Sequence, residues 1–209
     1  MRQRRTHRIM SAPLPFSLST GIILLTMKLY TKNGDSGETM LLFGGRISKS
    51  DPRAEAYGEV DASVSAMGLA RALSKDEFIR TTLLKIQREM FTVGSELATS
   101  PDKWNSLRSK YAVVTADMVS KIEEIIDRLQ RDIEMPPEFI VPGGSPGSGA
   151  LDLARSMIRT AERRVVALSE TGEIKNGEVL RYLNRVSDLL FIMARYEDRD
   201  KPFELSSEK

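Results

Sequence analysis

The chain has 209 residues, of which 41% are hydrophobic and 29% are charged, as is typical of a single globular domain. It has no cysteine, and its only histidine is His7, so imidazole bases, thiolate nucleophiles and ordinary zinc sites are excluded from the rest of the chain. The remaining polar side chains suit phosphate chemistry, in which positioning and charge neutralisation dominate. The formal net charge of +2 gives no general nucleic-acid signature, and no apolar run is long enough to span a membrane.

Residues 1–26 are rich in arginine, contain no Asp or Glu, and resemble a targeting segment in composition. In the alternative interpretation Met27 is the true first residue and the preceding stretch is an over-extended reading frame. Pro13 and Pro15 would interrupt an amphipathic targeting helix, which favours this alternative. We expect a disordered extension here. The cytoplasm is then the expected compartment, and the mitochondrial matrix only if the segment is a genuine targeting signal.

The body of the chain is expected to be one domain over residues 27–200, followed by a frayed tail over residues 201–209. Residues 30–49 are rich in glycine and lack a helical period, which predicts a loop or short extended structure. Residues 100–114 and 138–149 are predicted as further loops. Apolar residues recur at helical spacing in the stretches between these loops. The predicted helices run from about Pro52 to Leu73, from about Asp76 to Thr99, from Thr115 to before Pro136, from Leu151 to Leu168 and from Val179 to Met193.

Five long helices without strands between them predict an all-α bundle with up-down packing. Polar residues and one phenylalanine on its last two helices recur at i, i+4 and i+7, away from the apolar stripes. These residues are Arg155, Arg159 and Glu162, with Arg163 beside them, and Asn184, Asp188 and Phe191. An ordinary solvated surface is one interpretation of such residues. If the two faces pack together, however, they form a cationic pocket.

The glycine-bearing segment 30–49 offers backbone N–H groups to an anion, and it also supplies the charges of Lys32 and Lys49 and the hydroxyl of Thr39. It has no Walker A motif. An ordinary turn, in which Asp35 accepts hydrogen bonds from nearby amides, explains the same residues equally well.

Asp61 and Phe139 also have two interpretations each. Asp61 is either an exposed helix residue or the carboxylate partner of a buried arginine such as Arg155. Phe139 is either a core anchor or an aromatic ring that presses on a planar ligand from a loop rich in glycine and proline.

Several motifs follow one another between Met27 and about Tyr196: YTKNGDSG, FGGRISK, EAYGEVD, FIVPGG, RSMIRTAERR and YLNRVSDLLF. With these motifs in this order, the chain resembles the ATP:cob(I)alamin adenosyltransferases of the propanediol-utilisation type. The resemblance implies a cobalamin adenosyltransferase-like five-helix fold. It also implies a homotrimer with ATP held between neighbouring subunits.

The same resemblance assigns residues to roles by motif. It implies an Asp61–Arg155 pair between subunits and a corrin-facing Phe139, which joins Arg159, Arg163 and Lys49 as a catalytic residue. Glu162 is expected to orient Arg159 or a water on magnesium. The implied ATP contacts are Thr31, Lys32, Asn33, Gly34, Thr39, Lys49, Arg159, Glu162, Arg163 and Asn184.

The implied reaction transfers the 5′-deoxyadenosyl group of ATP to the Co(I) of reduced cobalamin and releases triphosphate. Magnesium is expected to arrive on ATP rather than on protein ligands. A reductase and a cobalamin-dependent mutase are the expected transient partners, and neither nucleic acid nor a membrane is expected. The chain departs from the family pattern at Thr160, where a second arginine is common, and in the DASV sequence that begins at Asp61.

Two alternatives to this enzyme differ in class. A non-catalytic ATP- and cobalamin-binding trimer, acting as a chaperone or sensor, would need the same loop and the same arginines. A ferritin-like di-iron bundle is excluded, because its Glu-x-x-His motifs need histidines that the body of the chain lacks.

Overall fold

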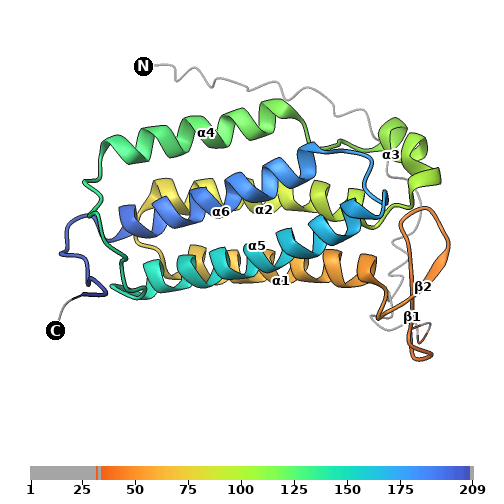
Figure 1. Cartoon of the computed structure of the whole chain (residues 1–209), viewed down its shortest axis with the longest axis horizontal. Helices are drawn as coiled ribbons and strands as arrows, with labels where there is room; N and C mark the ends of the chain where they lie inside the picture. The colour runs from red at the N-terminus through yellow and green to blue at the C-terminus, as the bar shows by residue number, and fades with distance from the viewer. Residues whose placement is uncertain (1–31, 33, 208–209) are drawn as a thin grey trace, which may run out of the picture. The chain divides into compact units, whose positions relative to one another are not determined.

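The computed structural model describes residue 32 and residues 34–207. The second range forms a helical bundle with a small antiparallel hairpin at one end (Figure 1). None of the helices described is long and apolar enough to cross a membrane. The strands are β1 (Glu38–Met40) and β2 (Arg46–Ser48), and the helices are α1 (Pro52–Leu73), α2 (Glu77–Leu97), α3 (Trp104–Lys110), α4 (Ala116–Arg131), α5 (Pro146–Glu170) and α6 (Glu178–Glu197).

The five long helices confirm the predicted all-α bundle, but two predicted loops are wrong in part. The segment 100–114 contains a 3₁₀ turn over Pro101–Lys103 and the short helix α3, which the fully buried Leu107 anchors. Helix α5 begins at Pro146, inside the second predicted loop. Ser145 caps this helix through a reciprocal pair of hydrogen bonds with Ser148, and proline is well tolerated in a first helical turn.

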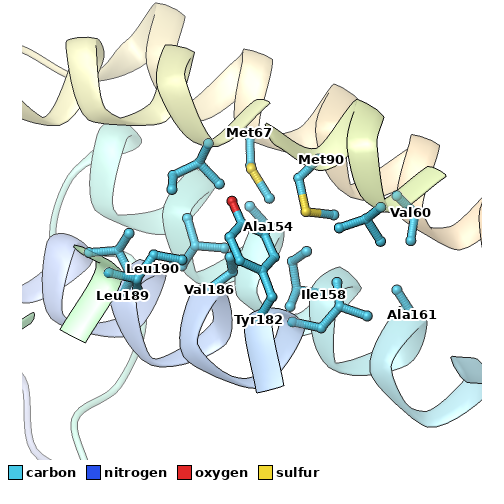
Figure 2. Close-up of a cluster of buried hydrophobic side chains, with 14 of the residues drawn as sticks. Val60, Met67, Met90, Ala154, Ile158, Ala161, Tyr182, Val186, Leu189 and Leu190 are labelled. Carbon is cyan, nitrogen blue, oxygen red and sulfur yellow. The ribbon is translucent and has the colours of Figure 1, made fainter. Parts of the chain in front are cut away.

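The core lies between the long helices, and small side chains bring α1 and α5 close together. Ala56 and Ala70 on α1, and Ala154 and Ala161 on α5, are fully buried. Figure 2 shows part of this core, in which Met67 of α1, Met90 of α2, Ala154 of α5 and Tyr182 of α6 belong to one buried cluster. The α5 and α6 backbones are therefore held by a close-packed interior, which fixes their outward-facing polar residues as well.

Arg53 anchors the bundle at the end where the hairpin lies. Its buried guanidinium donates to the backbone oxygens of Leu97 and Thr99 at 2.7 and 2.8 Å, and to the Glu173 carboxylate at 2.6 Å. These bonds join the start of α1, the end of α2 and the turn between α5 and α6. The hairpin is attached beside them through the N–H of Leu42, which donates to the α2 cap residue Ala98 at 2.9 Å.

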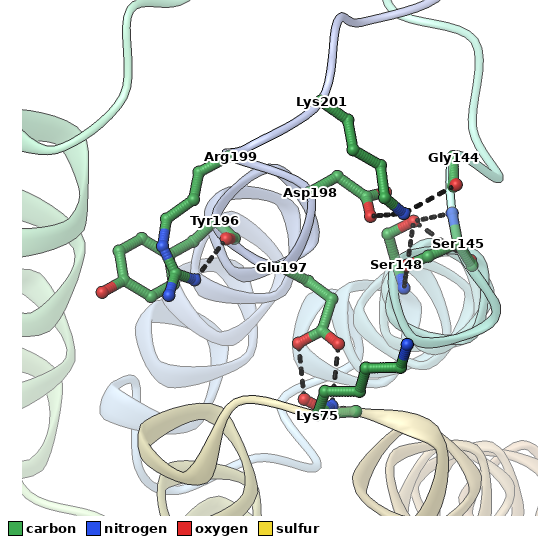
Figure 3. A network of polar contacts seen from close by, with 10 residues as sticks. Lys75, Gly144, Ser145, Ser148, Tyr196, Glu197, Asp198, Arg199 and Lys201 are labelled. Carbon is green, nitrogen blue, oxygen red and sulfur yellow. Dashed lines mark hydrogen bonds and ion pairs between the residues drawn. The ribbon is translucent and has the colours of Figure 1, made fainter.

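The opposite end of the bundle is held by the last residues of α6 (Figure 3). The Glu197 carboxylate accepts hydrogen bonds from the Ser74 hydroxyl and the Lys75 N–H, at 2.6 and 2.8 Å. Asp198 pairs with Lys201 at 3.0 Å and packs so closely on Gly144 that a Cβ there would lie 2.7 Å from its Oδ2. A larger residue at position 144 would therefore have to displace the Asp198 carboxylate, where the loop before α5 passes the end of α6.

Glu96 is a buried carboxylate between α2 and the loop before α4. It accepts hydrogen bonds from the Val114 N–H at 2.5 Å and from the Asn176 side-chain amide at 3.0 Å. Burial raises the pKa of Glu96, and the two hydrogen bonds oppose that rise. Because the folded state binds the proton more tightly than the unfolded state, stability from this group is present below its ordinary pKa. This proton-linked contribution is lost as pH rises through the raised pKa, whereas the hydrogen bonds that the carboxylate accepts remain.

We expect Glu96→Ala to lower the free energy of unfolding by about 2 kcal/mol at neutral pH, because the buried Val114 N–H loses its acceptor and the part-buried Asn176 amide loses one of two. The variant should also lose the part of the pH dependence that Glu96 supplies. Urea unfolding at several pH values measures both effects. Glu124→Ala, at an exposed position on α4, is the control. Equal stability of the Glu96 variant and the wild type would contradict this role.

Candidate active site

The polar faces predicted on α5 and α6 meet in the structure. The side-chain Nδ2 of Asn184 donates to Glu162 Oε1 at 3.0 Å. About two helical turns away along α5, the Arg155 guanidinium lies over the ring of Phe191, 5.3 Å from its centroid. The pairing of the two helix faces is therefore confirmed. Glu162 is held by Asn184, and no hydrogen bond of the described chain joins it to Arg159.

Several cations of the predicted site have no carboxylate partner. Arg159 is exposed and has neither a hydrogen bond nor an ion pair to any described residue. Arg163, one turn further along α5, donates only to the Thr160 hydroxyl, at 2.9 Å. Two neighbouring guanidinium groups without counter-ions favour an anionic ligand on this face.

The hairpin places Lys49 over the glycine turn that precedes β1. A Cβ built on Gly34 would lie 3.1 Å from the Lys49 Nζ, so the ammonium group rests against this turn. The Lys49 N–H donates to the Gly37 oxygen at 2.8 Å, and Thr39 pairs with Ile47 across the hairpin. The Lys49 ammonium therefore lies beside a small turn in which the N–H groups of Gly37 and Lys49 already donate to backbone oxygens.

Of the remaining residues of the predicted ATP loop, the structure describes Lys32. Lys32 is exposed and has a positive φ of 59°. Thr31 and Asn33 lie outside the described residues.

Phe139 lies in the loop between α4 and α5, at the end of the bundle opposite the hairpin (Figure 1). Its side chain is 86% exposed, so it is not a core anchor in this chain. The segment around it pairs with the end of the chain: the Ser206 N–H donates to the Phe139 oxygen, and the Val141 N–H donates to the Glu204 oxygen, at 2.9 and 2.8 Å. These bonds hold the loop while the ring points to solvent.

A cleft of about 390 Å³ lies between α4 and the joined faces of α5 and α6. Arg155 and Phe191 line it together with Arg185 and Asp188 of α6 and with Glu123 of α4. Sequence analysis missed the contributions of Arg185 and Glu123. The signal for Arg185 was its place in the NRVSD motif, but nothing in the sequence indicated that α4 would supply its partner.

Asp61 lies apart from this cleft, in an apolar hollow of about 320 Å³ on α1 and α2. Tyr57, Met90 and Phe91 line this hollow, and the Phe91 side chain is 65% exposed. Within the described chain neither Asp61 nor Arg155 forms an ion pair. The structure therefore does not bring these two residues together within one copy.

No group of three or more His, Cys, Asp or Glu side chains that could hold a metal ion occurs among residues 32 and 34–207. The site instead consists of cations without carboxylate partners and a cleft, partly lined by Phe191, on a helical bundle. This combination defines the chain as a helical-bundle protein suited to a phosphate-bearing ligand together with a larger, partly apolar one.

Comparison with known proteins identifies the family. The cobalamin adenosyltransferase family model matches residues 29–197. The corrinoid adenosyltransferase of Bacillus subtilis is 44% identical over 173 residues, covering 81% of this chain and 86% of the relative. PduO of Salmonella typhimurium is 38% identical over 174 residues; this match covers 83% of the chain but only 51% of that longer protein.

A solved structure agrees in fold. It is a phenylalanine-to-alanine variant of the PduO-type ATP:corrinoid adenosyltransferase from Lactobacillus reuteri, complexed with cobalamin and ATP. It matches with a TM-score of 0.79 at 34% identity, covering 87% of this chain and all of the other. The chain belongs to the cobalamin adenosyltransferase family.

Proposed function

We propose that this protein transfers the 5′-deoxyadenosyl group of ATP to the Co(I) of reduced cobalamin, forming adenosylcobalamin and releasing triphosphate. The observation that carries the proposal is the group of cations without counter-ions, Lys49, Arg159 and Arg163, in a chain whose residues 29–197 match this family. Three positive charges suit the triphosphate of ATP.

The proposed reaction does not require a covalent bond between the substrate and a protein side chain. Reduced cobalt attacks the ribose C5′, the C5′–O bond breaks, and the triphosphate leaves with the electron pair of that bond. The nucleophile arrives with the substrate, so no side chain has to act as a base. Lys49, Arg159 and Arg163 would stabilise the negative charge that develops on the leaving group. Thr31, Lys32, Asn33, Gly34 and Thr39 would complete the nucleotide loop.

Magnesium is assigned to the nucleotide rather than to a protein cage. Glu162 has one carboxylate oxygen, Oε2, that makes no hydrogen bond to the described chain, which suits a water on such an ion. Bound magnesium would supply further charge neutralisation on the triphosphate. Glu162 would orient this water while it holds Asn184 beside the nucleoside.

The corrin is assigned to the aromatic residues. Phe139 would close the lower face of the corrin, since the described body of the chain offers no histidine to ligate the cobalt there. Its exposure in a loop held by backbone bonds fits a residue that meets a ligand rather than the core. The cleft beside Arg155 and Phe191 provides a partly apolar wall for the same ligand.

We further propose a homotrimer whose active sites lie between subunits. The hairpin with Lys49 and the loop with Phe139 lie at opposite ends of one bundle, so one copy alone does not assemble the site (Figure 1). The unpaired Asp61 and Arg155 have opposite charges, and exposed Phe91 lies in the hollow beside Asp61. A second copy of this chain that brings its Arg155 to this hollow would cover the apolar surface and pair both charges.

This pairing predicts a charge-exchange result. Asp61→Arg should raise the trimer dissociation constant at least about tenfold, because it sets two cations against each other across the interface. The double variant Asp61→Arg/Arg155→Asp should recover much of the assembly. Analytical ultracentrifugation over a dilution series measures this, with Glu124→Arg on exposed α4 as the control. Trimers unaffected by Asp61→Arg would contradict the assigned pair.

A chaperone or sensor trimer would bind the same ligands without turning them over. Release of triphosphate in the presence of chemically reduced cobalamin separates the two functions, because only the transferase produces it. A reductase and a cobalamin-dependent mutase remain the proposed transient partners. The proposed compartment is the cytoplasm, or the mitochondrial matrix if residues 1–26 are a targeting segment.

A further inference from the structure

Arg185 connects α4 to the amide of Asn184 on α6. Its Nε donates to Glu123 Oε1 at 2.9 Å, and its Nη1 donates to Asn184 Oδ1 at 2.7 Å and to Asp188 Oδ2 at 2.9 Å. The guanidinium is planar and its donors are fixed in a fork, so contacts on both sides hold it in one orientation. Arg185 therefore forms a rigid brace behind Asn184.

These hydrogen bonds determine which way the Asn184 amide points. A guanidinium only donates and a carboxylate only accepts, so Arg185 must face the amide oxygen and Glu162 must face the amide nitrogen. Rotating the amide by 180° would set two donors against each other and two acceptors against each other. A row of hydrogen-bonded side chains thus runs from α4 through α6 to α5, and its donors and acceptors allow one orientation of the central amide. The row consists of Glu123, Arg185, Asn184 and Glu162.

We propose that Arg185 is a positioning residue for the nucleotide. It holds Asn184 so that the second Nδ2 hydrogen, which Glu162 does not use, is offered to an acceptor atom of the nucleoside, such as a ring nitrogen or a ribose oxygen. Arg185 acts on the nucleotide only through Asn184 and touches no reacting atom. The inference rests on the proposed function, in which Asn184 contacts the adenosine side of ATP.

Arg185→Met should raise both the Kd and the KM for MgATP about tenfold, the typical value of one charge-assisted hydrogen bond, and should change kcat at saturating ATP less than about twofold. Arg185→Lys should give Kd and KM values between those of Arg185→Met and the wild type, since lysine keeps a hydrogen-bond donor but loses the forked guanidinium. Calorimetric titration with MgATP and steady-state kinetics measure the two effects. Arg181→Met, one turn earlier on α6 and paired only with Glu178, is the matched control.

A double-mutant cycle tests whether Arg185 acts through Asn184. In an Asn184→Ala background, adding Arg185→Met should change the Kd for MgATP less than about twofold, because the group it positions is gone. A further tenfold weakening would show an independent role and overturn the inference. Glu123→Gln keeps the bond to Asn184 but loosens the other end of the brace, so its effect should be smaller, about threefold. Glu123→Gln also serves if Arg185→Met fails to fold.

Different results would overturn the nucleotide contact of Asn184 and the positioning role of Arg185. If Asn184→Ala leaves the affinity for MgATP unchanged, Asn184 is not a nucleotide contact, and the proposed site is wrong together with this inference. If Asn184→Ala weakens binding while the Arg185 variants bind as the wild type does, only the positioning role is overturned. Thermal unfolding of each variant separates loss of affinity from loss of the fold.

Discussion

Arg159→Ala is expected to lower kcat about 10²- to 10³-fold, because Arg159 would stabilise the charge that develops on the departing triphosphate. Arg159 is exposed and has no partner in the described chain, so its removal leaves no buried group unsatisfied and should not destabilise the fold. The Kd for MgATP should rise less than kcat falls. Single-turnover formation of adenosylcobalamin, measured beside nucleotide binding, gives both quantities.

Arg164→Ala provides a matched control on the same helix. Arg164 is also exposed, but it pairs with Glu55 of α1 at 3.3 Å and has no assigned role in the site. This variant should retain wild-type turnover. Equal losses in the two variants would indicate a general effect of charge on α5, and wild-type turnover in Arg159→Ala would remove Arg159 from the catalytic residues.

Phe139→Ala is expected to cut turnover with cobalamin about a hundredfold, as suits the loss of a large aromatic contact with the corrin. The affinity for MgATP should stay the same, since Phe139 is assigned to the corrin and is not among the proposed ATP contacts. The side chain is exposed, so its removal creates no core cavity. Turnover with chemically reduced cobalamin and a separate MgATP titration test both parts.

Val141→Ala is the control for this second variant, because Val141 is another exposed apolar residue in the same loop. Its N–H bond to Glu204 involves the backbone and survives the substitution. Turnover in this control should stay near the wild-type value. Unchanged turnover in Phe139→Ala would refute the corrin-facing role.

The fold could largely be predicted because long amphipathic helices repeat their apolar residues many times. Helix α3 escaped prediction, since a seven-residue helix offers few apolar positions, and only Leu107 in it is buried. The start of α5 was placed too late for a different reason. Glycine and proline at 146–149 indicate a loop by composition, but the capping bonds of Ser145 turn the same residues into a first helical turn.

The sequence predicted those parts of the candidate site whose residues share one face of a single helix. The spacing of residues placed Glu162 on a polar face of α5 and Asn184 on a polar face of α6, because i, i+4 positions share a helix face. The hydrogen bond that joins these two residues was not predicted. The brace from Glu123 to Arg185 was not predictable in this way. It depends on how α4 packs beside α6, and no periodicity within α4 specifies that arrangement.

The separation of Lys49 and Phe139 within one bundle also required the structure. Sequence order places both residues in glycine-containing loops without indicating that these loops lie at opposite ends (Figure 1). This geometry makes the assembly of copies part of the proposed mechanism. The sequence motifs assign roles to Lys49 and Phe139 by resemblance to a family, but they do not show where the two residues lie.

Adenosyl transfer itself is tested most directly by anaerobic incubation of the full chain with ATP, magnesium and chemically reduced cobalamin. The absorption spectrum should show a new cobalt–carbon bond that light destroys, and one triphosphate should appear for each corrin converted. Arg159→Ala, which keeps the fold, should lose both signals together. Corrin and ATP that bind to the wild-type protein, yet give neither the light-sensitive product nor triphosphate, would contradict the account.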